Sequence, residues 1–249
     1  MSLFNRSASR GPRPKRSPTP TGNGPSITRE RSLGPPSRPQ SPGSNGGRPL
    51  YLCSPFADAA LVKGNFKTIV MLPKYVDVME WVAVNIYDFY TNLNEFYGII
   101  TECCTHQTCP TMSCGPTLNY PWINHAGKAM TLSAPTYIDT VMSSLQKLVE
   151  DENVFPTKTN QPFHSSFPNT IRNIYRQLLR VFAHIYYAHF PQVLHLRAEP
   201  HFNSLFAHFL AFGREYELLD VRDIKGESSS PVAVGALWER WRQAGILEA

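Results

Sequence analysis

The sequence predicts an all-α globular domain behind a disordered N-terminal tail. Apolar residues recur every three or four positions in several stretches after Pro73, which is the spacing of amphipathic helices. Any strands are expected to be short, and no repeat of about 20–50 residues is visible. The chain has 249 residues, 42% of them hydrophobic, so it can bury one sizeable core. We therefore expect a helical bundle.

The basic charge of the chain belongs to its first 50 residues. They hold nine Lys and Arg residues against the single acidic residue Glu30, whereas residues 51–249 hold 15 basic and 18 acidic residues. A segment this polar and rich in proline cannot bury enough apolar surface to offset its chain entropy. We expect a disordered Pro/Ser/Arg-rich tail over 1–50, an ordered or partly ordered extension over 51–70, and the helical domain over 71–249.

Five helices are expected within the domain. The first ends near Gly98, the second follows Pro135 as a helix follows an N-terminal proline, and the third stops at Pro191. The third has the clearest apolar stripe, from Ile171 to Ile185. The expected ranges are 76–97, 137–149, 171–185, 200–218 and 231–247.

The loop between the first two helices, residues 99–135, shows little periodicity, so it needs a stabilising cross-link to another part of the chain. Cys104 and Cys109 lie in this loop as a C-x4-C pair, and His184 and His189 form a later H-x4-H pair. Two thiolates and two imidazoles suit a closed tetrahedral zinc site. We therefore predict a structural Zn²⁺ that fastens the loop.

The spacing leaves alternatives open. On a straight α-helix, positions five apart diverge by about 140°, so the helix end would have to unwind before Pro191 to bring His189 round. Cys103 or Cys114 could replace one of the two thiolates, and the histidines could simply pack in the core.

The third helix also carries a basic stripe, because Arg172, Arg176 and Arg180 stand four residues apart. Planar guanidinium groups can clamp a phosphate or a carboxylate. A merely solvated helix face is the simpler reading of the same pattern.

The first helix carries an acidic series around Trp81. A domain of negative net charge could receive a basic partner segment on such a face, and the simpler interpretation is a solvated one. The acidic residues of this series are Asp77, Glu80, Asp88 and Glu95.

Several functional classes are disfavoured. No stretch approaches the about 18 apolar residues of a membrane helix, and no signal-peptide core is present, so we expect a soluble, intracellular protein. Phosphate-loop, nucleophile-elbow and zinc-hydrolase motifs are absent, and a closed zinc site leaves no position for water. We expect a binding module and no enzyme. A nucleic-acid-binding protein that uses the basic tail is a distant alternative.

A series of ordered blocks resembles the Mob family of kinase coactivators over about residues 70–224. The blocks are the Cys104 and Cys109 pair together with Glu80-Trp-Val-Ala-Val-Asn85, Phe96-Tyr-Gly98, Pro110-Thr-Met-Ser-Cys-Gly-Pro116, Ser133-Ala-Pro-Thr-Tyr-Ile-Asp139, Val154-Phe-Pro-Thr-Lys158, Ala183-His-Ile-Tyr186 and Phe209-Leu-Ala-Phe-Gly-Arg-Glu215. Three further blocks look like the second, fungal-type branch: Ser54-Pro-Phe56, Ala60-Leu-Val-Lys-Gly-Asn-Phe66 and Leu72-Pro-Lys-Tyr-Val-Asp77.

This resemblance implies a four-helix bundle without catalytic activity. It implies binding to the basic N-terminal extension of an NDR/Lats-class AGC serine/threonine kinase. The second branch pairs with NDR-class kinases in cell polarity and morphogenesis, and the first branch serves Lats-class kinases in mitotic exit and Hippo-type signalling, which is the alternative. The implied location is the cytoplasm, with the cell cortex, sites of polarised growth and the nucleus in addition.

The resemblance also assigns roles to residues. The family's zinc ligands fall on Cys104, Cys109, His184 and His189. Its acidic kinase-binding positions fall on Glu80 and Asp88, while a third acidic position is occupied by Val76. Its phosphopeptide pocket falls on Arg176, position 177 and Arg180, and the neutral Gln177 implies only weak binding of phosphorylated scaffold proteins.

Overall fold

The computed structural model describes residues 44–45, 47–62, 64–124, 126–158 and 161–247, and these are mostly helical. The predicted all-α class is confirmed. The helical segments are η1 (Leu50–Leu52), η2 (Phe56–Asp58), α1 (Phe66–Val70), α2 (Val78–Gly98), α3 (Ala134–Val149), α4 (Phe167–His184), the π-helix η3 (Ile185–His189), α5 (Phe190–His195), α6 (Glu199–Glu215), α7 (Val221–Lys225) and α8 (Val234–Gln243).

Most of the predicted tail, residues 1–43 and residue 46, lies outside the described residues, so its disorder stays a prediction. Strands among the described residues are two residues long, as the sequence predicted. They form the antiparallel pairs β1 (Ser44–Asn45) with β2 (Arg48–Pro49), β3 (Trp122–Ile123) with β4 (Ala129–Met130), and β5 (Gly226–Glu227) with β6 (Ser230–Pro231).

Helix starts follow from local chemistry. The Asp77 carboxylate accepts hydrogen bonds from the backbone N–H groups of Met79 and Glu80, at 2.8 and 3.2 Å, which fixes the start of α2. Helices α3, α4 and α6 each carry a proline in the first turn, where the missing N–H has no helical partner. α3 and α4 therefore begin before the ranges expected from apolar spacing alone.

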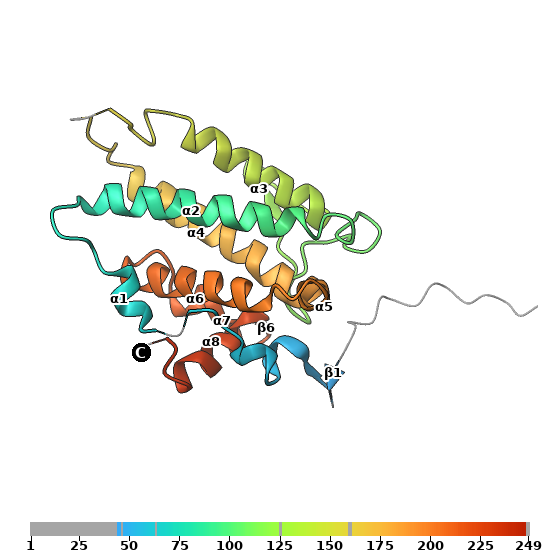
Figure 1. Cartoon of the computed structure of the whole chain (residues 1–249). Coiled ribbons are helices and arrows are strands. Elements are labelled where there is room, and N and C mark those ends of the chain that lie inside the picture. Colours follow the sequence, from blue (N-terminus) through green and yellow to red (C-terminus); the bar gives the residue numbers. More distant parts are fainter. Residues whose placement is uncertain (1–43, 46, 63, 125, 159–160, 248–249) are drawn as a thin grey trace, which may run out of the picture. The chain divides into compact units, whose positions relative to one another are not determined.

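Four long helices, α2, α3, α4 and α6, pack together and contain most of the core (Figure 1). An aromatic cluster joins three of them. The ring of Tyr175 on α4 stacks on that of Phe209 on α6 at 4.1 Å, and Phe89 on α2 meets both rings edge-on. The Tyr175 hydroxyl donates to the Phe209 carbonyl at 2.7 Å, so this fully buried polar group is satisfied. None of the described helices could cross a membrane.

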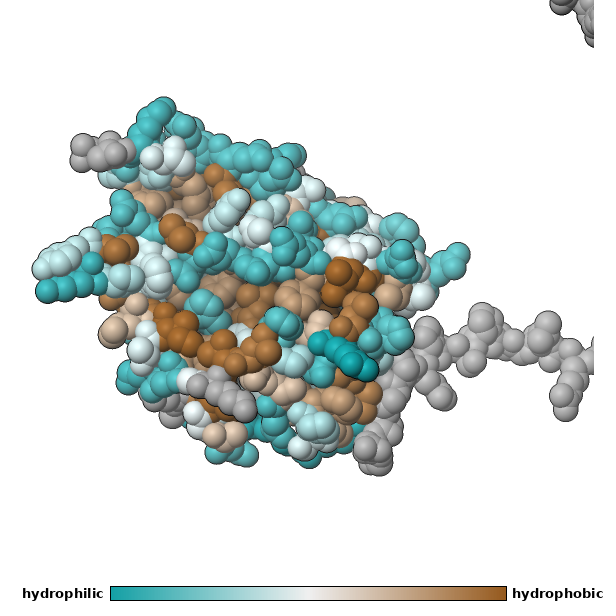
Figure 2. Space-filling model, in the orientation of Figure 1, coloured by the Kyte–Doolittle hydropathy of each residue, from teal (hydrophilic) through white to brown (hydrophobic). Residues whose placement is uncertain are grey.

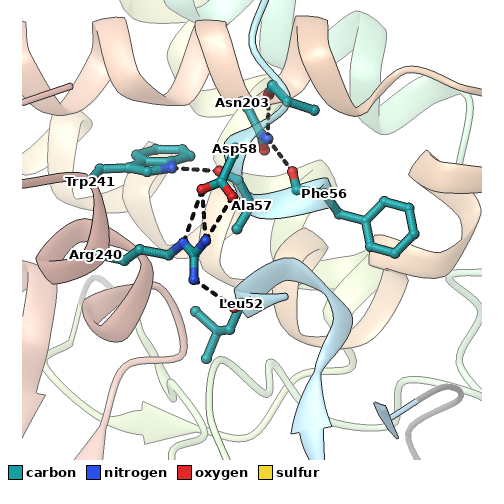
Figure 3. A network of polar contacts seen from close by, with 8 residues as sticks. Leu52, Phe56, Ala57, Asp58, Asn203, Arg240 and Trp241 are labelled. Atoms are coloured by element: carbon teal, nitrogen blue, oxygen red, sulfur yellow. Dashed lines mark hydrogen bonds and ion pairs between the residues drawn. The ribbon is translucent and has the colours of Figure 1, made fainter. Parts of the chain in front are cut away.

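The segment 50–62, here called the N-terminal strap, packs across α6 and α8. The indole N–H of Trp241 donates to the Ala57 carbonyl at 2.8 Å, and Arg240 contacts both carboxylate oxygens of Asp58 (Figure 3). Buried Asn203 on α6 donates to the carbonyls of Phe56 and Ala59. These contacts join residues more than 140 positions apart, so the helical periodicity could not reveal them.

The third helix does not stop at Pro191, and that prediction is wrong. α4 passes into the π-helix η3 and then directly into α5, with Pro191 in the first turn of α5. A π-turn hydrogen-bonds each residue to the fifth residue along, and a proline is tolerated where its nitrogen has no donor role. The helix therefore widens over Ile185–His189, and the backbone leaves helical dihedral angles only at His189, the N-cap of α5 (φ −128°, ψ 9°).

Hydrophobic side chains remain exposed on one face of the domain. Figure 2 shows hydrophilic residues over α3 and a band of hydrophobic residues across the middle of the same face. Among the described residues, independently of this view, large hydrophobic side chains are exposed to 93% at Tyr75 before α2 and to 56% and 50% at Val84 and Tyr87 on α2. An exposed apolar band of this kind is typical of a protein-binding surface.

Candidate metal centre and binding surfaces

The structure brings together the four residues that the sequence proposed as metal ligands. One ligand atom from each of Cys104, Cys109, His184 and His189 lies within 4.8 Å of all the others, and all four side chains are buried. The Cys104 Sγ is 3.5 Å from His184 Nε2, and the Cys109 Sγ is 3.3 Å from His189 Nε2. A tetrahedral zinc with ordinary Zn–S and Zn–N bonds has S···N edges of about 3.6 Å. The donor set therefore fits a tetrahedral metal ion.

The π-helix explains how two histidines five residues apart face the same point. His184 ends α4 and His189 ends η3, and their ring centroids are 5.1 Å apart. In an α-helix the two side chains would diverge, but the wider π-turn places the fifth residue almost in line with the first. A single π-turn of this kind is a recurrent feature of functional sites.

Neighbouring groups orient the ligands. His184 Nδ1 lies 2.8 Å from the Ser113 carbonyl, which fixes Nδ1 as the N–H donor and turns Nε2 toward the sulfurs. Tyr97 lies at the end of α2 close to Cys104, and burial, with the neighbouring Cys104 as a second cause, raises the pKa of its phenol. Neither Tyr97 nor Ser113 was predicted from the sequence, and no local pattern marks them.

The two thiols are electrostatically coupled. The interaction between the two neighbouring thiols lowers the pKa of Cys109 well below its ordinary value and raises that of Cys104, which burial raises further. Contacts with His184 and His189 lower the Cys109 pKa further. One thiolate is therefore held ready beside two imidazoles, and a divalent cation would favour deprotonation of the second.

The other loop cysteines lie outside this cluster. Cys103 is half-buried, and Cys114 is fully buried with its thiol donating to the Arg180 carbonyl at 3.3 Å. The alternatives in which Cys103 or Cys114 replaces a ligand are therefore not the arrangement found.

The acidic face of α2 is exposed as the sequence suggested. Glu80 and Asp88 stand eight residues apart, and the exposed Val84 lies midway between them on the same side of the helix. Tyr87 extends this strip. In the described part of the chain, neither carboxylate forms an ion pair with a basic side chain within 4 Å. The face thus combines unpaired negative charge with apolar contact area, which sequence reasoning described only as acidic.

The arginine stripe does not form one clamp. Arg180 donates to the Tyr137 hydroxyl at 2.7 Å and lies over the Tyr120 ring at 4.4 Å. Arg176 pairs with Asp223 at 3.2 Å. Arg172 donates through Nε to the Glu217 carbonyl at 3.1 Å. The three side chains are therefore distributed over different partners.

Comparison with known proteins gives a family. A model of the Mob1/phocein family matches residues 58–227. The chain is 50% identical over 174 residues to the maintenance of ploidy protein mob2 of Schizosaccharomyces pombe, covering 70% of this chain and 71% of that protein. It is 48% identical over 176 residues to the CBK1 kinase activator protein MOB2 of Candida albicans, covering 71% of this chain and 56% of that protein.

A human protein is also similar. MOB kinase activator 2 of Homo sapiens is 44% identical over 176 residues, which cover 71% of this chain and 74% of that protein. The matched family model spans more than half of the chain, and the fungal relatives carry the second-branch name that the blocks before α2 suggested. The resemblance predicted from the sequence is confirmed, and the chain belongs to the Mob1/phocein family.

Proposed function

We propose that this protein is a noncatalytic kinase coactivator that binds the basic N-terminal extension of an NDR-class AGC kinase through the exposed face of α2. The observation that carries the proposal is the strip of Glu80, Val84, Tyr87 and Asp88, where unpaired carboxylates flank exposed apolar side chains. An amphipathic basic helix matches both features, with its charges steering association and its apolar residues adding contact area.

Relatives support this proposal by name. The Candida albicans relative is called a kinase activator protein and the human relative a kinase activator. A coactivator of this kind acts by binding one kinase conformation more tightly than another, which shifts the population toward the active form. We place the protein in the cytoplasm, including the cell cortex at sites of polarised growth, with the nucleus as a further location.

We further infer that the metal of the Cys/His cluster is Zn²⁺ with a structural role. Two thiolates and two imidazoles fill the four positions of a closed site, and Zn²⁺ is the ion that this donor set favours. The ion would connect the loop of Cys104 and Cys109 with the end of α4 and with η3. Elemental analysis should give one zinc per chain, retained by Cys103→Ser and lost by Cys109→Ser.

Binding of a phosphorylated scaffold is proposed to be weak. Gln177 is neutral, and Arg180 already binds the Tyr137 hydroxyl and the Tyr120 ring, so a phosphate would have to compete for its N–H groups.

The kinase proposal is tested by charge reversal. Glu80→Lys with Asp88→Lys should weaken binding of a purified NDR-class N-terminal extension by at least tenfold at low salt, and the difference should shrink as salt rises. The matched control, Glu102→Lys with Glu227→Lys, changes the net charge by the same amount at exposed residues outside α2. Equal weakening by both pairs would show a general charge effect, and unchanged binding by the first pair would place the interface elsewhere. Preferential recovery of a Lats-class kinase by affinity purification would support the first-branch alternative.

A further inference from the structure

Two neighbouring pockets form a continuous groove on the described domain. The pocket here called the apolar pocket has a volume of about 390 Å³. Its apolar lining includes Phe66 on α1, Leu210 on α6, Val221 on α7, Trp238 on α8 and Leu247 after α8, and the charged residues Lys67, Arg214, Glu215, Glu217 and Arg242 share the lining. The polar pocket has a volume of about 540 Å³ and is lined by Arg172, Arg176, Arg214, Glu217 and Asp220. Arg214 and Glu217 line both pockets, so an extended ligand can occupy the two together.

Two arginine side chains of the polar pocket are held by hydrogen bonds to backbone carbonyls, and no carboxylate neutralises their positive charges. The Nε–H of Arg172 donates a hydrogen bond to the Glu217 carbonyl, and one terminal N–H of Arg214 donates to the Leu219 carbonyl at 2.8 Å. Among the ion pairs within the described residues, neither guanidinium has a carboxylate partner within 4 Å. Their remaining N–H groups are therefore oriented but available, which is the arrangement that captures an anion.

Arg176, by contrast, is already paired. It contacts Asp223 at 3.2 Å and Asp220 at 3.6 Å from the segment after α6. Its charge fixes this wall of the pocket and is not free for a ligand. The anion-binding capacity of the pocket thus comes from Arg172 on α4 and Arg214 on α6.

The apolar pocket supplies the second half of the recognition surface. Trp238 and Leu247 are almost fully buried at its floor, whereas Val221 is 40% exposed at its edge. The apolar part of this lining suits one aliphatic or aromatic side chain, beside the charged side chains that share the pocket.

We propose that this groove binds a short partner segment in which an apolar residue is followed closely by a glutamate or aspartate. The apolar side chain enters the pocket beside Trp238 and Val221, and the carboxylate pairs with Arg172 and Arg214. The groove involves none of the exposed residues of the α2 strip, so a kinase extension on α2 and this segment can bind at the same time.

The charge of the polar pocket favours a carboxylate over a phosphate. The residues that line the polar pocket include three arginines and two carboxylates, Glu217 and Asp220, so they carry a single excess positive charge. One carboxylate neutralises that excess. A phosphate dianion would instead bring two negative charges beside two carboxylates, and like charges in close contact disfavour binding.

The test uses the full chain and four fluorescein-labelled nonapeptides in fluorescence anisotropy. The first has one phenylalanine followed by one glutamate in a Gly/Ser background. The others replace the glutamate with glutamine, the phenylalanine with alanine, or the glutamate with phosphoserine. We expect the first peptide to bind at least fivefold more tightly than each of the other three. Equal binding of all four peptides overturns the proposal. Equal binding of the first peptide and either the glutamine or the alanine peptide also overturns it, because the acidic or the apolar residue would then make no contribution.

Variants locate the binding. Arg172→Gln and Arg214→Gln should each reduce affinity for the first peptide at least threefold, and Ala211→Met, which fills the apolar pocket without changing charge, should do the same. Arg222→Gln removes an exposed arginine that lines neither pocket and should leave affinity unchanged. Circular dichroism confirms that each variant is folded, and each must still bind the kinase extension. Tighter binding of the phosphoserine peptide that depends on the same two arginines refutes the carboxylate assignment.

Discussion

Replacing Asn203 with alanine should cost a large part of the stability of the domain. This side chain is 2% exposed on α6 and makes three hydrogen bonds. Its Nδ2 donates to the carbonyls of Phe56 and Ala59 at 2.8 and 2.7 Å, and its Oδ1 accepts from the Tyr186 hydroxyl at 2.9 Å. Asn203→Ala therefore leaves two carbonyls and one hydroxyl without partners in a buried place.

The magnitude follows from these three bonds. Each hydrogen bond contributes about 1 kcal/mol net, and a buried partner left unsatisfied adds to the loss. Alanine recovers about 0.5 kcal/mol through its higher helix propensity. We expect Asn203→Ala to lower the free energy of unfolding by about 3 kcal/mol, a large share of the roughly 5–15 kcal/mol typical of a domain. Tyr186→Phe removes one of the three bonds and should cost about 1 kcal/mol.

Urea unfolding followed by circular dichroism measures the loss. The matched control is Asn173→Ala, which makes the same chemical change at an exposed position inside α4 and should shift the free energy of unfolding by no more than about 0.5 kcal/mol. Amide exchange of the N-terminal strap should also accelerate in Asn203→Ala. A loss below about 1 kcal/mol at an unchanged urea dependence would refute the view that Asn203 holds the strap on α6.

Three further predictions concern the metal, pH and phosphate. Cys104→Ser or His189→Ala should abolish metal binding and lower the melting temperature while most far-ultraviolet ellipticity survives, since only the loop loses its fastener; unchanged melting would contradict a structural metal. Burial lowers the pKa of His208 to about 4 from 6.5, so the unfolded chain takes up the proton first and stability should fall by about 3 kcal/mol as the pH drops from 6.5 to 4. His208→Phe should flatten that part of the stability profile, and an unchanged profile would exclude this histidine as the cause. A phosphothreonine peptide should bind at most about tenfold more tightly than its unphosphorylated twin, about 1.4 kcal/mol, and Gln177→Arg should increase the ratio; strong discrimination by the unmodified protein would contradict the weakened site.

The main helices were predictable because their signals are local. Apolar spacing marks α2, α3, α4 and α6 within a few residues of their observed positions, and prolines mark the starts of α3 and α6. The short helices α1, α5 and α7 were not predicted. Each has five or six residues, too few for a periodic pattern, and each is stabilised by packing against larger elements.

The sequence by itself determined the fold class, the family resemblance and the identity of the four metal-binding candidates, because each depends on residue type and spacing. Only the tertiary structure decided how His189 turns toward Cys104, Cys109 and His184, since a π-turn at η3 is set by packing and not by propensity. Likewise, sequence placed Arg172, Arg176 and Arg180 on one stripe, but their partners come from segments as many as 60 positions away. Contacts over such distances depend on how the helices assemble. No local sequence pattern therefore shows which guanidinium groups remain available to bind a ligand.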